Sequence, residues 1–141
     1  MDRLSHIQRM LDTIPFEGDE AEPGAMESVI VAVRQLEEPR AAVPMLLRWF
    51  EANGEYDLGN PGPFVHFIEE QLDYIPALEE SLATRPTYLT VWMANRVANG
   101  EADPVKIGCW VNILRNVVQH SSADGRCKER AESFAIRQAS R

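Results

Sequence analysis

Apolar residues along the chain recur at intervals of three and four, which places them on one face of an α-helix. The first apolar stripe ends at Pro15, and the second, which contains Val29-Ile30-Val31, ends before Pro39. The third stripe predicts a helix over about 40–53, since Pro44 is tolerated in a first helical turn. The N-terminal part of the chain is therefore expected to form three helices.

Five further helices are predicted after the turn-rich segment 55–62. Each begins at a proline or at a side chain that can cap a helix N-terminus. The fourth helix is expected to extend to Leu72 and to bury it. The predicted starts of the five helices are Pro63, a position after Pro76, Pro86 or Thr87, Asp103-Pro104, and Ser122 or Asp124.

The pattern gives no indication of a β-sheet. No segment alternates apolar and polar residues between hairpin turns, and Val29-Ile30-Val31 lies within a helical stripe. The segment from Phe16 to Gly24 contains four acids and no base, so we interpret it as an exposed acidic loop.

These patterns predict an all-α fold of about eight antiparallel helices joined by short connectors. A length of 141 residues fits a single domain. The Ala-Val-Pro-x-Leu-Leu string from Ala42 to Leu47 is typical of HEAT-like repeats. An irregular bundle and a HEAT-like solenoid stack both remain open.

Charge is distributed unevenly along the chain. Residues 1–80 contain 17 acids and 5 bases, whereas residues 81–141 contain 5 acids and 9 bases, for a net charge of −8. An acidic face attracts basic proteins and repels nucleic acid. The group Arg126, Lys128 and Arg130 is a modest basic patch that a solvated helix face explains. We therefore expect no nucleic-acid partner, although solubility alone also accounts for excess acid.

A carboxylate-metal enzyme is an alternative interpretation of the acidic residues. Glu69, Glu70 and Asp73 have an E-E-x-x-D spacing that places carboxylates on one helix face, where two could ligate Mg²⁺. Such a site needs further carboxylates from a second helix. The other pair at this spacing, Glu129 and Glu132, lies among bases, so we expect no metal, no cofactor and no catalytic residue.

The remaining composition gives little specific chemistry. Cys109 and Cys127 have no metal-ligand spacing, and we expect both to be small buried helix residues. The sequence contains no stretch of about 18 apolar residues, the length needed to span a membrane. The N-terminus lacks the features of a signal peptide, which predicts a cytoplasmic protein.

Two strings of the sequence resemble a known class of proteins. They are Leu58-Gly59-Asn60-Pro61-Gly62-Pro63-Phe64-Val65-His66-Phe67-Ile68-Glu69, and Arg85-Pro86-Thr87 followed by Val91-Trp92-Met93-Ala94-Asn95-Arg96. Together they resemble helical immunity proteins encoded beside polymorphic bacterial toxins, including those of contact-dependent growth inhibition systems. The likeness covers about residues 40–100.

The resemblance implies a cytoplasmic antidote that binds and neutralises the C-terminal domain of a cognate toxin. Toxins of this kind are often nucleases with cationic active sites, which an acidic inhibitor can occupy as a phosphate mimic. A helical interaction adaptor without inhibitory activity is the alternative, and a carboxylate-metal nucleotide hydrolase is a further one. The residues expected to contact the toxin are Asp19, Glu20, Glu22, Glu55, Asp57, Glu69, Glu70 and Asp73, with Tyr56 and Tyr74 as aromatic anchors.

Overall fold

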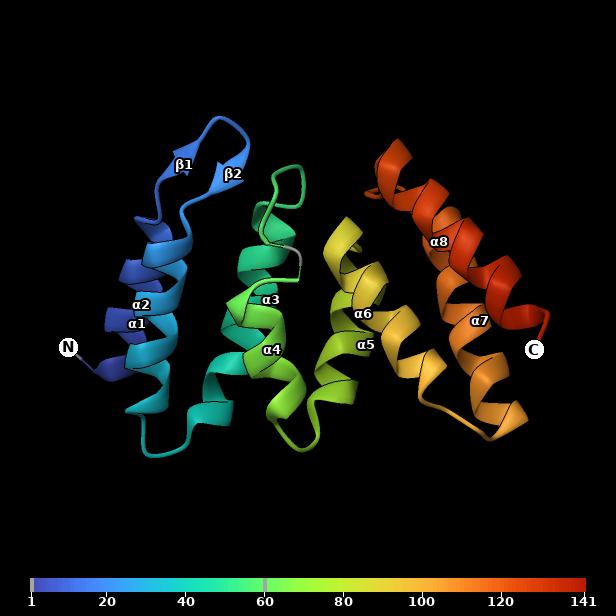
Figure 1. Cartoon of the computed structure of the whole chain (residues 1–141), viewed down its shortest axis with the longest axis horizontal. Coiled ribbons are helices and arrows are strands. Elements are labelled where there is room, and N and C mark those ends of the chain that lie inside the picture. The colour runs from blue at the N-terminus through green and yellow to red at the C-terminus, as the bar shows by residue number, and fades with distance from the viewer. Residues whose placement is uncertain (1, 60) are drawn as a thin grey trace. The chain divides into compact units, whose positions relative to one another are not determined.

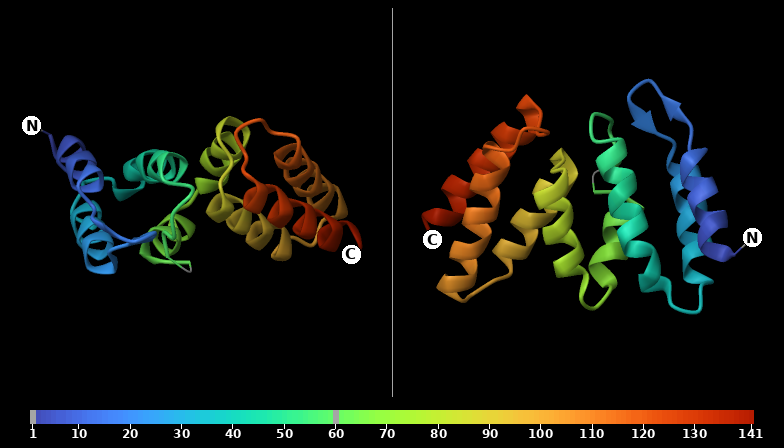
Figure 2. Two further views of the ribbon diagram at one scale, coloured as in Figure 1. Left: turned by 90° about the horizontal axis from the view of Figure 1, so that it is seen from above. Right: turned by 180° about the vertical axis from the view of Figure 1, so that it is seen from behind.

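A computed structural model of the chain describes residues 2–59 and 61–141 and confirms the all-α fold class. The chain divides into two compact units, one ending at Ala77 and the other spanning Leu78–Arg141. In each unit, consecutive helices run in opposite directions (Figure 1; Figure 2).

Unit 1 contains four complete α-helices and a two-stranded sheet among its described residues, and helix α5 begins in it. The elements are α1 (Arg3–Asp12), β1 (Phe16–Glu17), β2 (Glu20–Ala21), α2 (Pro23–Arg34), the 3₁₀ turn η1 (Pro39–Ala42), α3 (Val43–Ala52), α4 (Pro63–Glu70) and α5 (Tyr74–Thr84).

The core of unit 1 forms where α2 packs against α1 and α4, and where aromatic rings of α3 and α4 meet. The ring centroids of Trp49 and Phe64 are 5.2 Å apart in an edge-to-face arrangement, a geometry that aromatic pairs favour. The indole nitrogen of Trp49 donates a hydrogen bond to the carbonyl of Leu11 at 3.2 Å, so this buried ring also ties α3 to α1.

Unit 2 contains the remainder of α5 and three longer helices, α6 (Tyr88–Asn99), α7 (Pro104–Val118) and α8 (Gly125–Ala139). These three helices pack on one another, and α6 and α8 bury alanines that allow close approach of their backbones. The predicted start signals are confirmed: Thr87, Asp103 and Asp124 each accept a hydrogen bond from the first turn of the helix that follows.

Four predictions about the elements were wrong. The segment after Pro15 is mostly exposed, but it forms a hairpin, because its two short strands pair with each other. The expected helix over 40–53 begins as a 3₁₀ turn, and α5 begins at Tyr74, ahead of Pro76. Helix α4 ends at Glu70, since Gln71 adopts an extended conformation (ψ 137°), and this leaves Leu72 81% exposed.

Candidate partner-binding surface

The hairpin of unit 1 and the loop after α3 are held together by their backbones. Strands β1 and β2 pair through Glu17 and Glu20, and Gly18 adopts a positive φ of 65° in the turn between them. The amide of Asp57 donates to the carbonyl of Asp19, and the amide of Ala21 donates to the carbonyl of Asp57 at 2.9 Å. Two segments about 40 positions apart in the sequence thus form one surface.

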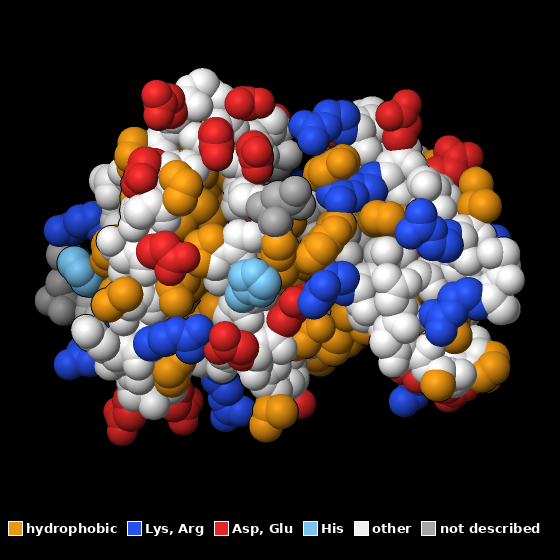
Figure 3. Space-filling model, in the orientation of Figure 1, with side chains coloured by type: hydrophobic (Ala, Val, Ile, Leu, Met, Phe, Trp, Pro, Cys, Tyr) orange, Lys and Arg blue, Asp and Glu red, His pale blue; other side chains and the backbone are white. Residues whose placement is uncertain are grey.

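This surface carries six exposed carboxylates. Figure 3 shows acidic side chains gathered at the upper left, over the hairpin and the loop after α3. Neither 10–33 nor 49–84 contains a lysine or arginine, so neither segment supplies a neutralising charge. We call this set the acidic patch: Glu17, Asp19, Glu20, Glu22, Glu55 and Asp57.

An aromatic cluster underlies the acidic patch. The ring of Tyr56 lies on that of Phe16, with centroids 4.6 Å apart, and Phe16 stacks in turn on Trp49 at 6.2 Å. Tyr56 is 37% exposed, so part of its ring is open to a partner. A groove of about 320 Å³ adjoins the cluster, lined by side chains that include Phe16, Trp49, Asp12 and Arg48.

Two carboxylates of the acidic patch also shape the backbone around it. Glu22 caps α2, accepting hydrogen bonds from the amides of Gly24 at 3.0 Å and Ala25 at 2.6 Å. Asp57 accepts a hydrogen bond from the amide of Gly59 at 3.0 Å. Asp19, Glu20 and Glu55 have no such structural bonds from their side chains among the described residues, which makes them the more available to a partner.

The other four predicted contact residues lie elsewhere in unit 1. Helix α2 starts next to the hairpin and ends at Arg34, which bonds Glu70 at 3.0 Å. Its 12 residues span roughly 18 Å, so Glu69 and Glu70 are about one helix length from the acidic patch. Glu69 and Glu70 therefore lie at the other end of α2 from the acidic patch and do not form one surface with it.

Asp73 and Tyr74 line a separate groove of about 340 Å³ beside the start of α5. Arg40 of η1 and Leu72 contribute to the same groove. Asp73 has a positive φ of 64°, a conformation that aspartate tolerates better than most residues. Tyr74 is thus a partly buried residue that lines this groove.

The E-E-x-x-D spacing does not form the helical carboxylate face that it predicts. Helix α4 ends before Asp73, and Glu70 is paired with Arg34, which holds the pKa of the Glu70 carboxyl below its usual range through hydrogen bonding. Across residues 2–59 and 61–141, no three His, Cys, Asp or Glu side chains converge in a way that could hold a metal ion. Glu69, Glu70 and Asp73 therefore do not share one helix face.

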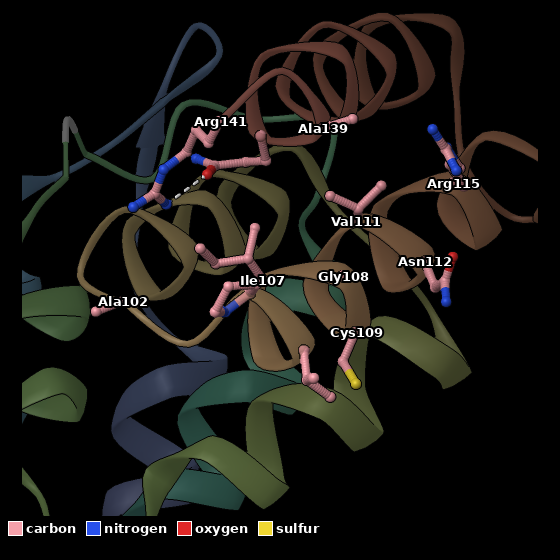
Figure 4. A pocket seen from close by; sticks show the side chains of 12 residues that line it. Ala102, Ile107, Gly108, Cys109, Val111, Asn112, Arg115, Ala139 and Arg141 are labelled. Atoms are coloured by element: carbon pink, nitrogen blue, oxygen red, sulfur yellow. Dashed lines mark hydrogen bonds between the residues drawn. The ribbon is translucent and has the colours of Figure 1, made fainter.

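Unit 2 has a groove of about 690 Å³ that the sequence pattern did not indicate, formed between α7 and the end of α8 (Figure 4). Arg141 borders it and is fixed by hydrogen bonds to the Gln138 side chain at 2.9 Å and to the carbonyls of Ala98 and Glu101. Val105, at 75% exposure, and Cys109 also line it. The helical period of the apolar residues does not indicate that exposed ones such as Val105 line a groove.

The two cysteines differ in environment. Cys127 is buried as expected, and burial raises the pKa of its thiol to about 11. Cys109 is exposed, so its predicted burial was wrong. Neither cysteine forms a disulfide.

Comparison with known proteins identifies no relative: no family model, no curated protein and no solved structure matches the chain.

Within the described residues, no helix has the length and apolar character needed to cross a membrane.

Proposed function

We propose that this chain is an immunity protein that binds and neutralises a cognate toxin domain, with the acidic patch as its contact surface. The observation that carries the proposal is the convergence of six exposed carboxylates from two base-free segments around Tyr56. The toxin domain is a cationic protein, and a nuclease is the class that the resemblance implies.

Electrostatics supports a cationic protein as the partner. Exposed carboxylates gathered at one end of a unit generate a field that accelerates encounter with a surface of opposite charge. A nuclease active site is such a surface, because it must hold phosphates. Carboxylates spread over the hairpin and the adjoining loop are suited to occupy several phosphate positions at once.

The aromatic cluster supports the same proposal. Tyrosine is enriched among the residues that dominate binding energy at protein interfaces, where it combines an apolar ring with a hydroxyl group. Tyr56 is partly exposed and rests on Phe16, so its orientation is already fixed before binding. The groove beside Trp49 offers space for a side chain of the partner.

The proposal predicts that a protein with a toxin domain is encoded immediately upstream of this chain. The test uses that toxin domain and a variant with Asp19→Asn, Glu20→Gln and Glu55→Gln. These changes spare the Glu22 cap and the Asp57 turn. We expect the association rate at low salt to fall by roughly tenfold or more, with a weaker dependence on ionic strength. Loss of protection in cells that express the toxin should accompany the fall.

A matched control removes the same charge elsewhere in the chain. Glu37→Gln, Glu79→Gln and Glu80→Gln alter exposed residues outside the acidic patch. Equal losses in both variants would mean that net charge, and not the patch, governs binding. Tight binding to the toxin that is indifferent to neutralisation of the patch would overturn the proposed contact surface.

A further inference from the structure

Three arginines of α8 lie along one side of the helix. Arg126, Arg130 and Arg137, together with Phe134, follow one another at intervals of four, four and three positions, which places them on a common face. We call the three arginines the arginine stripe. They span 11 positions, or roughly 16 Å along the helix axis.

Aromatic rings hold the arginine stripe in place. The guanidinium carbons of Arg126 and Arg130 lie 4.4 and 3.7 Å from the ring centroid of Tyr88 on α6. Those of Arg130 and Arg137 lie 5.5 and 6.0 Å from the centroid of Phe134. Arginine that packs on a ring keeps its N–H groups available at the guanidinium edge, where carboxylates bind in bidentate fashion.

The positive charge of the stripe is not neutralised within the described residues. No carboxylate lies within 4.0 Å of any of its three guanidiniums there, and Arg130 donates only to the backbone carbonyl of Tyr88, at 3.2 Å. Burial lowers the pKa of Arg130. The Tyr88 hydroxyl opposes this shift, and repulsion by the neighbouring charge of Arg126 adds to it. An anion at this position would relieve that repulsion.

We propose that the arginine stripe is a second docking surface, which binds a carboxylate-rich segment of a protein partner. The segment it fits is a helix with acidic residues at matching intervals of about one turn. This inference goes beyond the proposed function, since it concerns unit 2 and uses no residue of the acidic patch. Figure 3 shows basic side chains gathered on the visible face of unit 2, unlike the acidic upper end of unit 1.

Nucleic acid fits the stripe less well than a carboxylate-rich protein does. Base stacking needs open aromatic faces, and the ring of Tyr88 already lies against two guanidiniums. Binding to a phosphate backbone gains strength from many lysines and arginines, whereas the whole chain has a net charge of −8.

The test is a titration of the full chain followed by two-dimensional NMR of amide and arginine side-chain resonances. The probe is a synthetic helical peptide with glutamates at every fourth position, and the comparison peptide carries glutamine at those positions. We expect the glutamate peptide to shift resonances of α8 and the start of α6, and high salt to abolish the shifts. The glutamine peptide should leave them unchanged.

Two matched double variants locate the binding surface. Arg126→Gln with Arg137→Gln, both exposed, should weaken peptide binding by about fivefold or more. Lys106→Gln with Arg115→Gln removes the same charge from exposed positions of α7 and should change it by less than about twofold. Equal effects in the two variants would overturn the proposal, as would tighter binding of a single-stranded oligonucleotide of the same charge to the stripe.

Discussion

The guanidinium of Arg34 holds the carboxylate of Glu70 through two parallel hydrogen bonds of 3.0 and 3.1 Å. Arg34 is the last residue of α2 and Glu70 the last residue of α4, so the pair joins the ends of two helices that pack together. The guanidinium carbon also lies 5.2 Å from the ring centroid of Phe67. Glu70 was predicted to contact a partner, but its side chain is already occupied within unit 1.

This pair makes stability depend on pH in a defined direction. Arg34 lowers the pKa of Glu70 from its ordinary value of 4.5, so the ion pair stabilises the fold above about pH 4.5 and is lost as pH falls through the lowered value. We expect Glu70→Gln to lower the Tm slightly at about pH 7 and to converge with wild type once the pH falls below the lowered pKa of Glu70. Thermal unfolding monitored by circular dichroism across this range tests the prediction, with Glu37→Gln as control. Parallel curves for wild type and Glu70→Gln would contradict it.

Gln138 anchors a buried polar network in unit 2. Its side-chain nitrogen donates to Asn95 at 2.8 Å and to Asn99 at 2.6 Å, while its oxygen accepts from Arg141. Gln138→Ala removes this donor from Asn95 and Asn99, whereas Arg141 keeps its bonds to the carbonyls of Ala98 and Glu101. We expect a loss of about 2 kcal/mol in urea denaturation. The exposed Gln119→Ala should change stability by less than about 0.5 kcal/mol. An effect at Gln138 as small as at Gln119 would show that water replaces the network at no cost.

The two thiols should differ in reactivity. Cys109 is exposed, whereas Cys127 is buried with its pKa raised to about 11, so little thiolate forms there near neutral pH. We expect a thiol reagent to modify Cys109 of the native chain rapidly and Cys127 only on unfolding. Mass spectrometry of digested protein identifies the modified residue. Rapid labelling of Cys127 in the native state would reveal local opening of α8.

Two glycines should respond oppositely to alanine. Beyond the adjacent residues and the backbone of its own helix, a Cβ added at Gly108 meets no atom within 4 Å, so Gly108→Ala should stabilise α7 by about 0.5–1 kcal/mol. Gly59 has φ +112°, and a Cβ there would lie 2.7 Å from the α-carbon of Gly62, so Gly59→Ala should cost more than about 1 kcal/mol. Urea denaturation of both variants tests the pair. A neutral Gly59→Ala would mean that the turn can rearrange.

Local signals made much of the fold predictable. The start of α7 at Asp103-Pro104 and that of α8 after Asp124 follow from a capping side chain within a few residues of the helix it caps. The end of α4 was not predictable in this way. No glycine or proline interrupts Glu70 to Asp73, and the helix ends through backbone conformations at Gln71 and Asp73 that the apolar period does not encode.

The candidate site was only partly predictable, because composition does not place distant segments side by side. The excess of acid in the first 80 residues indicated an acidic face, but two-residue strands are too short to give an alternating pattern. Pairing of Asp57 with the hairpin joins positions far apart in the chain and depends on the tertiary fold. The sequence therefore pointed to Asp19 and Glu55, which the fold places in one acidic patch, but also to Glu70, whose carboxylate pairs with Arg34.

The pairing of β2 with both β1 and the segment at Asp57 leaves β1 as an open edge of the small sheet. Exposed strand edges can recruit strands of other molecules and initiate aggregation, and natural proteins prevent this with short edges and charged side chains. Here the edge is two residues long and includes Glu17. Repulsion between the acidic patches of two copies would therefore keep the hairpin from adding strands. Neutralising the carboxylates of the acidic patch would remove this protection against aggregation at high protein concentration.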